Sequence, residues 1–370
     1  AALDAVRAAW PSAAPGMVKD AQPARPEVVR DYEPVGFVVV GLGMGRGRSK
    51  TVLETPGTEL VGVCDIDQKR AESAAEELGV PCTFDVREWL DNDEVEVIYV
   101  LTPSGAHAEV GVQALEAGKH VLTTKPMDVS LEACDGMIHA AEERDLLLGV
   151  DFGMRFESDL LSLRKFVRDG GLGRVLGGQV SLKVLRTDEY YRRDGGWRGT
   201  LRWDGGGVLS NQCIHHIDQA VFVLGVPEAV KAEVYTQNHE IEGEDLGCAL
   251  WRYPDGSIVS LYATTCYPHK TWYFELELHG TEGAASFASG GPLEKKREQY
   301  FRDDVWTDEP PERVLSDWLN AADNFADALR TGAPLVCDGR DGRRTQAVLA
   351  AMYESGRGDG GWVEGGPGLD

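Results

Sequence analysis

Phe37-Val38-Val39-Val40-Gly41-Leu42-Gly43-Met44-Gly45-Arg46-Gly47, the stretch at residues 37–47, joins a short unbroken apolar run to a cluster of glycines. A continuous apolar run bounded by glycines is typical of a strand that is buried on both faces of a parallel sheet. The glycines permit a tight turn after the strand, and a helix is predicted to follow. This arrangement predicts the start of an α/β domain.

The residues that follow alternate between apolar runs and helical patterns. The alternation predicts a doubly wound parallel sheet with right-handed crossovers. The predicted strands are 59–64, 95–101, 120–123 and 146–150, and the predicted helices are 68–78, 106–117 and 131–144.

The second half of the chain carries longer segments in which apolar and polar residues alternate, which is typical of strands with one covered face. We therefore predict an α+β domain with a large, mostly antiparallel open sheet. Its predicted strands are 175–185, 229–236, 246–253, 257–264 and 272–280, and its predicted helices are 160–169, 214–224, 317–331 and 342–355.

Four segments are expected along the chain. Residues 1–33, rich in alanine, proline and charge, are interpreted as an N-terminal extension, and 34–152 as the domain built on the parallel sheet. Residues 153–355 are expected to form the α+β domain, and the glycine-rich residues 356–370 a tail.

Composition excludes several classes of partner. The net charge of −24 repels nucleic acid and anionic lipid, and no apolar run is long enough to cross a bilayer. The seven cysteines are scattered singly, which argues against a disulfide framework and against a zinc site. We expect a cytoplasmic protein without a catalytic metal, without nucleic-acid binding and without membrane association.

The glycine turn suits the pyrophosphate of a dinucleotide, because a helix N-terminus offers amide donors there. Its spacing departs from G-x-G-x-x-G, since Arg46 stands where the third glycine is expected, and the same residues also suit an ordinary loop. Asp65 ends the second predicted strand and can accept hydrogen bonds from the ribose hydroxyls of NAD. NAD is therefore the expected cofactor, with NADP possible because arginines lie nearby. The candidate cofactor-binding residues of this turn are Gly41, Gly43, Met44, Gly45 and Arg46.

Four further stretches resemble the family of glucose-fructose oxidoreductase and inositol dehydrogenase, Gfo/Idh/MocA. They are Val63-Cys64-Asp65; Thr102-Pro103-Ser104 with His107; residues 117–121 leading to Thr124-Lys125-Pro126; and Gly205-Gly206-Gly207 leading to His215 and Asp218. The resemblance implies that residues 34–152 form an NAD(P)-binding Rossmann domain and that 153–355 form a substrate and oligomerisation domain. The exposed face of the open sheet in this second domain is expected to make homodimers or homotetramers. The resemblance also implies that Thr102, Pro103 and His107 lie at the cofactor.

The resemblance implies that Lys125 reaches both cofactor and substrate, although Thr124 replaces the glutamate of the family's Glu-Lys-Pro motif. A carboxylate often precedes the family's catalytic histidine by four residues, and Asn211 holds that position before His215. Asparagine can orient a hydroxyl but cannot take a proton. With an asparagine at this position, the chain is similar to those family members that act on nucleotide-activated N-acetyl sugars.

Lys125, His215 and Asn211 are the candidate catalytic residues. Oxidation of a secondary alcohol requires a base for the hydroxyl proton, and the pKa of histidine suits that task. The ammonium of Lys125 can stabilise a developing alkoxide, and the two roles could also be exchanged or shared. A purely structural interpretation is the alternative to catalysis. Lys125 would then be a solvated residue at the end of a strand, and His215 a buried residue at the start of a helix.

Aromatic and guanidinium groups gather in a predicted loop that includes Tyr191, Trp197 and Arg198. Rings and forked donors match the faces and hydroxyl rims of sugars, although a solvated loop would look the same. The family places similar Trp-Arg pairs near the cofactor. Arg155, beside the domain boundary, is a further candidate for substrate binding or for a surface salt bridge.

These features predict an NAD(H)-dependent oxidoreductase that moves a hydride to or from a sugar, sugar derivative or polyol. Two alternatives share the same sequence features. One is a glycoside hydrolase or lyase that keeps NAD bound and returns the hydride. The other is a noncatalytic sensor that binds dinucleotide and sugar. The departures from the family motifs at Thr124 and Asn211 are consistent with the sensor.

Overall fold

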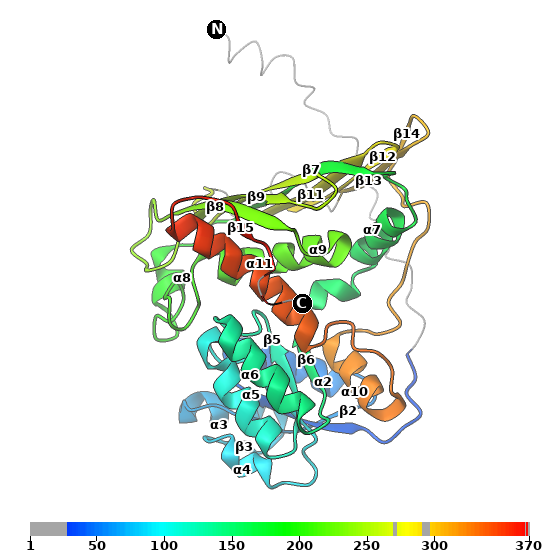
Figure 1. The fold of residues 1–370 in the computed structure, drawn as a ribbon. Coiled ribbons are helices and arrows are strands. Elements are labelled where there is room, and N and C mark those ends of the chain that lie inside the picture. Colours follow the sequence, from blue (N-terminus) through cyan, green and yellow to red (C-terminus); the bar gives the residue numbers. More distant parts are fainter. Residues whose placement is uncertain (1–27, 269–271, 291–296, 367, 369–370) are drawn as a thin grey trace.

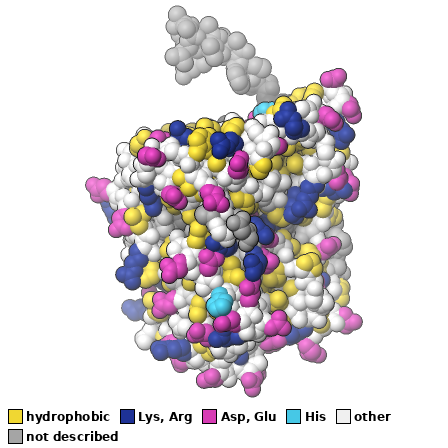
Figure 2. Space-filling view, viewed as in Figure 1, with side chains coloured by type: hydrophobic (Ala, Val, Ile, Leu, Met, Phe, Trp, Pro, Cys, Tyr) yellow, Lys and Arg dark blue, Asp and Glu magenta, His cyan; other side chains and the backbone are white. Residues whose placement is uncertain are grey.

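The computed structural model describes residues 28–268, 272–290, 297–366 and 368, and most of the predicted N-terminal extension lies outside them. Figure 1 shows two layered units, with the parallel sheet below and a broad open sheet above. Helices fill the space between them. Acidic and basic side chains are interspersed over the face drawn in Figure 2.

The first sheet is parallel throughout and has the strand order β3-β2-β1-β4-β5-β6. Every residue of its central strand β1 is buried, as the unbroken apolar run predicts. The predicted doubly wound sheet is therefore confirmed. Its strands are β1 (Val35–Val40), β2 (Thr58–Cys64), β3 (Cys82–Thr83), β4 (Val97–Val100), β5 (His120–Thr124) and β6 (Leu148–Asp151).

Helices cover both faces of this sheet. They are α2 (Gly45–Glu54), α3 (Gln68–Leu78), the short α4 (Arg87–Leu90), α5 (His107–Glu116) and α6 (Leu131–Glu142). Asp67 caps α3 by accepting a hydrogen bond from the amide of Arg70, and Gly79 ends the helix in a left-handed conformation. These signals explain why the prediction for 68–78 matches the helix.

The second sheet has nine strands in the order β14-β13-β12-β11-β7-β10-β9-β8-β15, all antiparallel neighbours except the parallel pair β7 and β10. The predicted open, mostly antiparallel sheet is thus confirmed. Its strands are β7 (Val175–Lys183), β8 (Ala229–Tyr235), β9 (Leu246–Arg252), β10 (Ile258–Thr264), β11 (Tyr273–Gly280), β12 (Gly283–Gly290), β13 (Arg297–Arg302), β14 (Val305–Thr307) and β15 (Val363–Glu364).

One face of the second sheet packs on helices, as Figure 1 shows. These helices are α7 (Ser158–Arg168), α9 (Ile214–Leu224) and α11 (Gly339–Arg357). Trp251 is completely buried on that side, whereas Tyr235, Leu250 and Tyr262 project from the opposite face, where each is more than a third exposed. None of the described helices is both long and apolar enough to cross a membrane.

Helix α10 (Ala321–Thr331) returns the chain to the first sheet. The ring of Phe325 is fully buried and meets Phe37 of β1 edge-on, with the ring centroids 6.4 Å apart. Together with α2 and α3, α10 therefore completes the apolar layer on one face of the Rossmann sheet.

We expect Phe325→Ala to lower the free energy of unfolding by about 3–5 kcal/mol, because it leaves a cavity against β1. Urea denaturation followed by circular dichroism measures this loss. Val305→Ala, at an exposed position of β14, should stay within about 0.5 kcal/mol of the wild type. Equal stabilities for Phe325→Ala and Val305→Ala would contradict the role assigned to α10.

Candidate active site

A cavity of about 1470 Å³ opens at the carboxyl ends of the first sheet's strands. Ligands of open α/β sheets bind in this kind of crevice. One wall comes from the loops after β1, β2, β4 and β5. The other comes from the second unit, through α8 (Asp188–Arg192), the loop 193–203 and the π-helical turn Val208–Cys213 that leads into α9.

The glycine turn lines the cavity through Gly41, Leu42, Gly43 and Met44. Gly41 has a φ of +90°, and a Cβ there would lie 2.6 Å from backbone atoms of Leu101 and Thr102, so no other residue fits. Helix α2 begins at Gly45 without a side-chain cap. Its first amides and its positive dipole end are therefore available to a phosphate, and the turn fits a dinucleotide.

Gly45 and Arg46 do not line the cavity. Gly45 is buried in the first turn of α2, and the Arg46 side chain contacts α3, where it donates to Ser73 Oγ at 2.8 Å and pairs with Glu77 at 3.3 Å. The turn of the helix directs Arg46 away from the phosphate position. The Arg46 side chain thus links α2 to α3, and only the backbone amide of this residue faces the helix N-terminus.

Asp65 lies on the cavity wall at the end of β2. Its Oδ2 accepts a hydrogen bond from the Leu42 amide at 2.7 Å, and Oδ1 accepts one from the Asp67 amide at 2.9 Å. Arg70 approaches the same carboxylate at 3.3 Å. Oδ2 accepts from both Leu42 and Arg70, whereas Oδ1 accepts one bond and retains a further lone pair, so Asp65 both fixes the turn and can accept from a ribose hydroxyl.

Thr102, Pro103 and His107 follow β4 and line the cavity. The Thr102 hydroxyl is buried without a hydrogen-bond partner among the described residues. The ring nitrogens of His107 lie 2.9 Å from the carbonyl oxygens of Thr102 and Pro126, and burial lowers the pKa of this histidine. His107 thus holds two loops of the cofactor wall together. Thr124, buried at the end of β5, also lines the cavity.

Lys125 follows β5 and reaches across to the second unit, where Nζ donates to the carbonyl oxygen of Asn211 at 2.9 Å. Burial lowers the pKa of Lys125 to about 8, while the Asp204 carboxylate acts in the opposite direction. The group is therefore still mostly an ammonium at neutral pH, but it can lose its proton in a mildly alkaline solution.

His215 faces the same cavity from the first turn of α9. Burial lowers its pKa well below the usual value, and the positive charge of Lys125 adds to this effect. Its Nδ1 is buried without a hydrogen-bond partner among the described residues, and its ring meets Phe152 edge-on. A neutral imidazole beside an ammonium is the combination expected of a general base next to an electrostatic stabiliser.

The neighbouring His216 turns into the core. Its ring stacks on Phe274 with centroids 3.7 Å apart, and Nδ1 lies 2.8 Å from Gln219 Oε1.

A second cavity, of about 350 Å³, lies on another side of His215 and is lined by Arg48, Tyr99 and Asp151 among others.

Asp204 is the functional candidate that sequence reasoning missed. Asn211 Nδ2 donates to Asp204 Oδ1 at 2.7 Å, and burial raises the pKa of Asp204 to about 6. A carboxylate thus lies in hydrogen-bond contact with Asn211. An acidic residue directly before the triple glycine Gly205-Gly206-Gly207 was the signal available in the sequence.

The aromatic loop divides between cavity and core. Trp197 and Arg198 line the cavity, and Arg198 pairs with Asp194 at 2.8 Å. Tyr191 does not line it, because its ring is buried and its hydroxyl donates to Thr265 at 2.9 Å. The adjacent Tyr190 lines the cavity instead and donates to Asn211 Oδ1 at 3.1 Å.

Arg155 lies away from the cavity in a buried ion pair. Its guanidinium forms two hydrogen bonds to Asp218, at 2.7 and 3.0 Å, and one to Asp341 at 3.1 Å. A fork of this kind joins α9 to α11 and uses the charge internally. The structure therefore separates Arg155 from Lys125 and His215.

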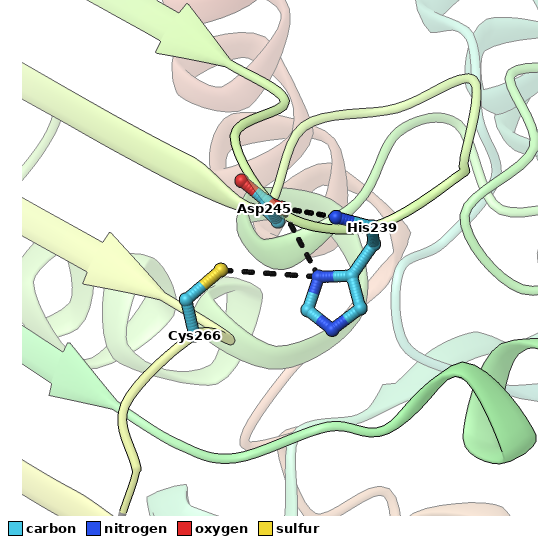
Figure 3. A group of neighbouring side chains, drawn as sticks. All are labelled: His239, Asp245 and Cys266. Carbon is cyan, nitrogen blue, oxygen red and sulfur yellow. Dashed lines mark hydrogen bonds and ion pairs between the residues drawn. The ribbon is translucent and has the colours of Figure 1, made fainter.

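Among the described residues, one group has the composition of a metal site: His239, Asp245 and Cys266 (Figure 3). His239 Nδ1 lies 3.0 Å from Asp245 Oδ2, and Nε2 lies 2.8 Å from the carbonyl oxygen of Arg186. Asp245 also accepts hydrogen bonds from the amides of residues 237–239. Because these contacts use both ring nitrogens, the group is built as an anchor for this loop.

Two family models match the chain. Residues 35–152 match the oxidoreductase family with an NAD-binding Rossmann fold, and residues 160–286 match the GFO/IDH/MocA C-terminal domain. The chain belongs to the Gfo/Idh/MocA family. The resemblance seen in the sequence is thereby confirmed, and so is a nicotinamide cofactor, because the family's first domain is an NAD-binding fold.

The relatives with known names include dehydrogenases of sugars and polyols. The chain is 25% identical to scyllo-inositol 2-dehydrogenase (NADP(+)) of Bacillus subtilis, over 89% of this chain and 97% of that protein. It is 26% identical to glucose-6-phosphate 3-dehydrogenase of the same organism, over 86% and 95%. Among solved structures, the WlbA dehydrogenase from Bordetella pertussis in complex with NADH and UDP-GlcNAcA has a TM-score of 0.80 and 26% identity, over 90% of this chain and 99% of that one. The chain is thus an enzyme of the sugar dehydrogenase kind.

Asp204→Asn should lower the pKa of Lys125 further, because it removes the carboxylate that favours the ammonium. Only the neutral amine reacts with acetic anhydride, so the pH at which Lys125 is half-maximally acetylated reports this pKa. Peptide mass spectrometry should place that pH near 8 in the wild type and lower in the variant.

Asp194→Asn is the matched control, because Asp194 pairs with Arg198 rather than acting on Lys125. Its acetylation profile should overlay that of the wild type. An Asp204→Asn profile that does not move, or that moves to higher pH, would contradict the coupling.

Proposed function

We propose that this protein is an NAD(H)-dependent oxidoreductase that transfers a hydride between nicotinamide and a secondary alcohol or ketone of a sugar, sugar derivative or polyol. The observation that carries the proposal is the convergence of Lys125 and His215 on the cavity that the glycine turn also lines. These groups come from the two units of the chain, and neither alone would serve the reaction.

A bound nicotinamide would supply the hydride acceptor at its C4 carbon. In alcohol oxidation, the carbon-bound hydrogen leaves as a hydride, and the hydroxyl proton passes to His215. His215 is available for this proton because its low pKa keeps the imidazole neutral. The Lys125 ammonium holds the substrate oxygen and stabilises the charge that develops on it. Ketone reduction runs these steps in reverse.

Asp204 and Asn211 position the lysine. Asn211 offers its backbone carbonyl to Lys125 and its side-chain amide to Asp204, so one residue connects both charges. Tyr190 fixes the other end of the Asn211 side chain. We assign to Asn211 the orientation of lysine and substrate, and to Asp204 the maintenance of the lysine's charge.

For the cofactor, we propose a preference for NAD over NADP. The carboxylate of Asp65 stands at the end of β2, where it would accept from the ribose hydroxyls and repel a 2′-phosphate. Arg70 partly offsets this charge at 3.3 Å.

We further propose a cytoplasmic enzyme that assembles as a homodimer or homotetramer and binds neither nucleic acid nor membranes. The exposed face of the second sheet, with Tyr235, Leu250 and Tyr262, offers an apolar surface to a second copy. The net charge of −24 disfavours polyanionic partners. For the substrate we propose a class, sugars and polyols. The dehydrogenases of inositol and glucose 6-phosphate among the relatives support this class.

The proposal predicts that the wild type forms NADH when it is incubated with NAD and a panel of sugars and polyols, as measured by absorbance. Lys125→Met and His215→Gln should each reduce kcat by about 10²–10⁴, because each removes a group that acts in the transition state. Binding of NADH, followed by fluorescence titration, should stay close to that of the wild type. His139→Gln, at an exposed position of α6, is the control and should retain full activity.

Other outcomes would replace the proposal. Cleavage of a glycoside without net NADH would favour an enzyme that keeps its NAD and returns the hydride. Tight binding of NADH and sugar with no turnover of either kind would favour the sensor.

The cofactor proposal predicts a kcat/KM for NADH that exceeds that for NADPH by roughly tenfold or more, since apposed like charges cost at least about 1.4 kcal/mol. Asp65→Asn should bring the two values together. Glu72→Gln, on the exposed side of α3, should leave the ratio unchanged. A wild type that prefers NADPH would overturn the assignment.

A further inference from the structure

Arg186 is a cavity residue whose charge has no carboxylate partner. It lies between β7 and α8 and lines the large cavity together with Tyr190, Asn211, Gln212 and His215. Within residues 28–268, 272–290 and 297–366, no carboxylate forms a salt bridge with its guanidinium. In a chain with 61 acidic and 37 basic residues, such an isolated cation needs a reason.

The other arginines of this cavity are all paired. Arg70 pairs with Asp65, Arg87 with Asp85, and Arg193 and Arg198 with Asp194. Among these five arginines, Arg186 alone has no carboxylate partner within the described residues. Its charge is therefore available to a ligand in the cavity.

Neutral contacts hold the Arg186 guanidinium in place. Nη2 donates to Gln212 Oε1, and the guanidinium lies 4.7 Å from the ring centroid of Tyr190. Gln212 in turn donates to the Tyr190 hydroxyl at 2.8 Å. The guanidinium is therefore oriented by the residues around it without being neutralised by them.

Donors remain free on this group. A guanidinium carries five N–H donors, and the described residues accept one of them, from Nη2 to Gln212; Nε is enclosed by protein, so the donors left for a ligand are those on Nη1 and the second one on Nη2. A forked, positively charged donor of this kind matches the paired oxygens of a carboxylate or a phosphoryl group.

The position of Arg186 assigns it to the substrate rather than to the cofactor. Arg186 donates a hydrogen bond to Gln212, which directly follows Asn211 in the sequence. The carbonyl oxygen of Asn211 accepts a hydrogen bond from the Lys125 ammonium. The dinucleotide phosphates, in contrast, belong at the glycine turn on the opposite unit.

We propose that Arg186 binds an anionic group of the substrate, a carboxylate or a phosphoryl group, and thereby selects acidic or phosphorylated sugars over neutral ones. The inference rests on the proposed sugar oxidoreductase function and names the class of its substrate. Two positive charges, Arg186 and Lys125, face this part of the cavity, so an anion also offsets their mutual repulsion.

Isothermal titration calorimetry on the NADH-loaded, full-length protein tests the proposal. The probes are glucose, glucuronate and glucose 6-phosphate. At least one anionic probe should bind the wild type tenfold or more tightly than glucose. Preference for glucuronate identifies a carboxylate site, and preference for glucose 6-phosphate identifies a phosphoryl site.

Arg186→Met should remove this advantage while leaving the affinity for NADH unchanged, and Arg186→Lys should restore part of it, because the charge returns without the fork. Arg192→Met is the matched control, since Arg192 is exposed, lies on the same segment and does not line the cavity. It should bind all probes as the wild type does.

Equal affinities of the wild type for glucose and both anionic probes would overturn the proposal, as would an Arg186→Met variant that keeps the preference. Failure of the proposed function looks different. Anion binding that depends on Arg186, without reduction of NAD by any sugar, would leave this site in place and remove hydride transfer.

Discussion

The interaction on which the site depends is that between the buried ammonium of Lys125 and the carboxylate of Asp204. Burial alone disfavours the charged lysine, and the neighbouring carboxylate acts against this effect. Asp204 is itself disfavoured as an anion by burial, and the Gly199 amide, the Asn211 side chain and the Lys125 ammonium act against this effect. Burial keeps the imidazole of His215 neutral, and the Lys125 ammonium adds to this effect. Burial and the charges of neighbouring groups together set the protonation of Lys125, Asp204 and His215.

The fold allows these charges to interact because it brings residues of both units to one cavity. Lys125 follows a strand of the first sheet, whereas Asp204, Asn211 and His215 come from a turn and a helix start in the second unit. The backbone must pack closely there: a Cβ on Gly207 would lie 1.8 Å from the carbonyl oxygen of Glu244. The glycine therefore allows the π-helical turn to lie flat against its neighbour and to present Asn211 to the lysine.

Sequence patterns predicted the features that local chemistry determines. The strand-turn-helix around Gly41, the acidic end of β2 and the helix at 68–78 all follow from propensity and capping. Strand β12 was missed because its run of Gly, Ala and Ser lacks the alternation of a strand with one covered face.

The partners of charged residues could not be predicted, because they depend on contacts between distant segments. Arg155 pairs with Asp218 and Asp341 in the core, whereas Arg186 pairs with no carboxylate in the described part of the chain, and nothing near either residue in the sequence distinguishes them. The choice of Tyr190 over Tyr191 depends in the same way on which side of α8 faces the cavity.

The return of α10 to the first sheet has a consequence for biosynthesis. Phe325, which covers β1, is translated long after the last strand of that sheet at Leu148–Asp151. During translation, the part of the nascent Rossmann sheet that α10 covers therefore stays open until the chain has emerged from the ribosome past residue 331. The interval between these two events is when the polypeptide most needs a chaperone, since exposed strands and apolar surface favour aggregation.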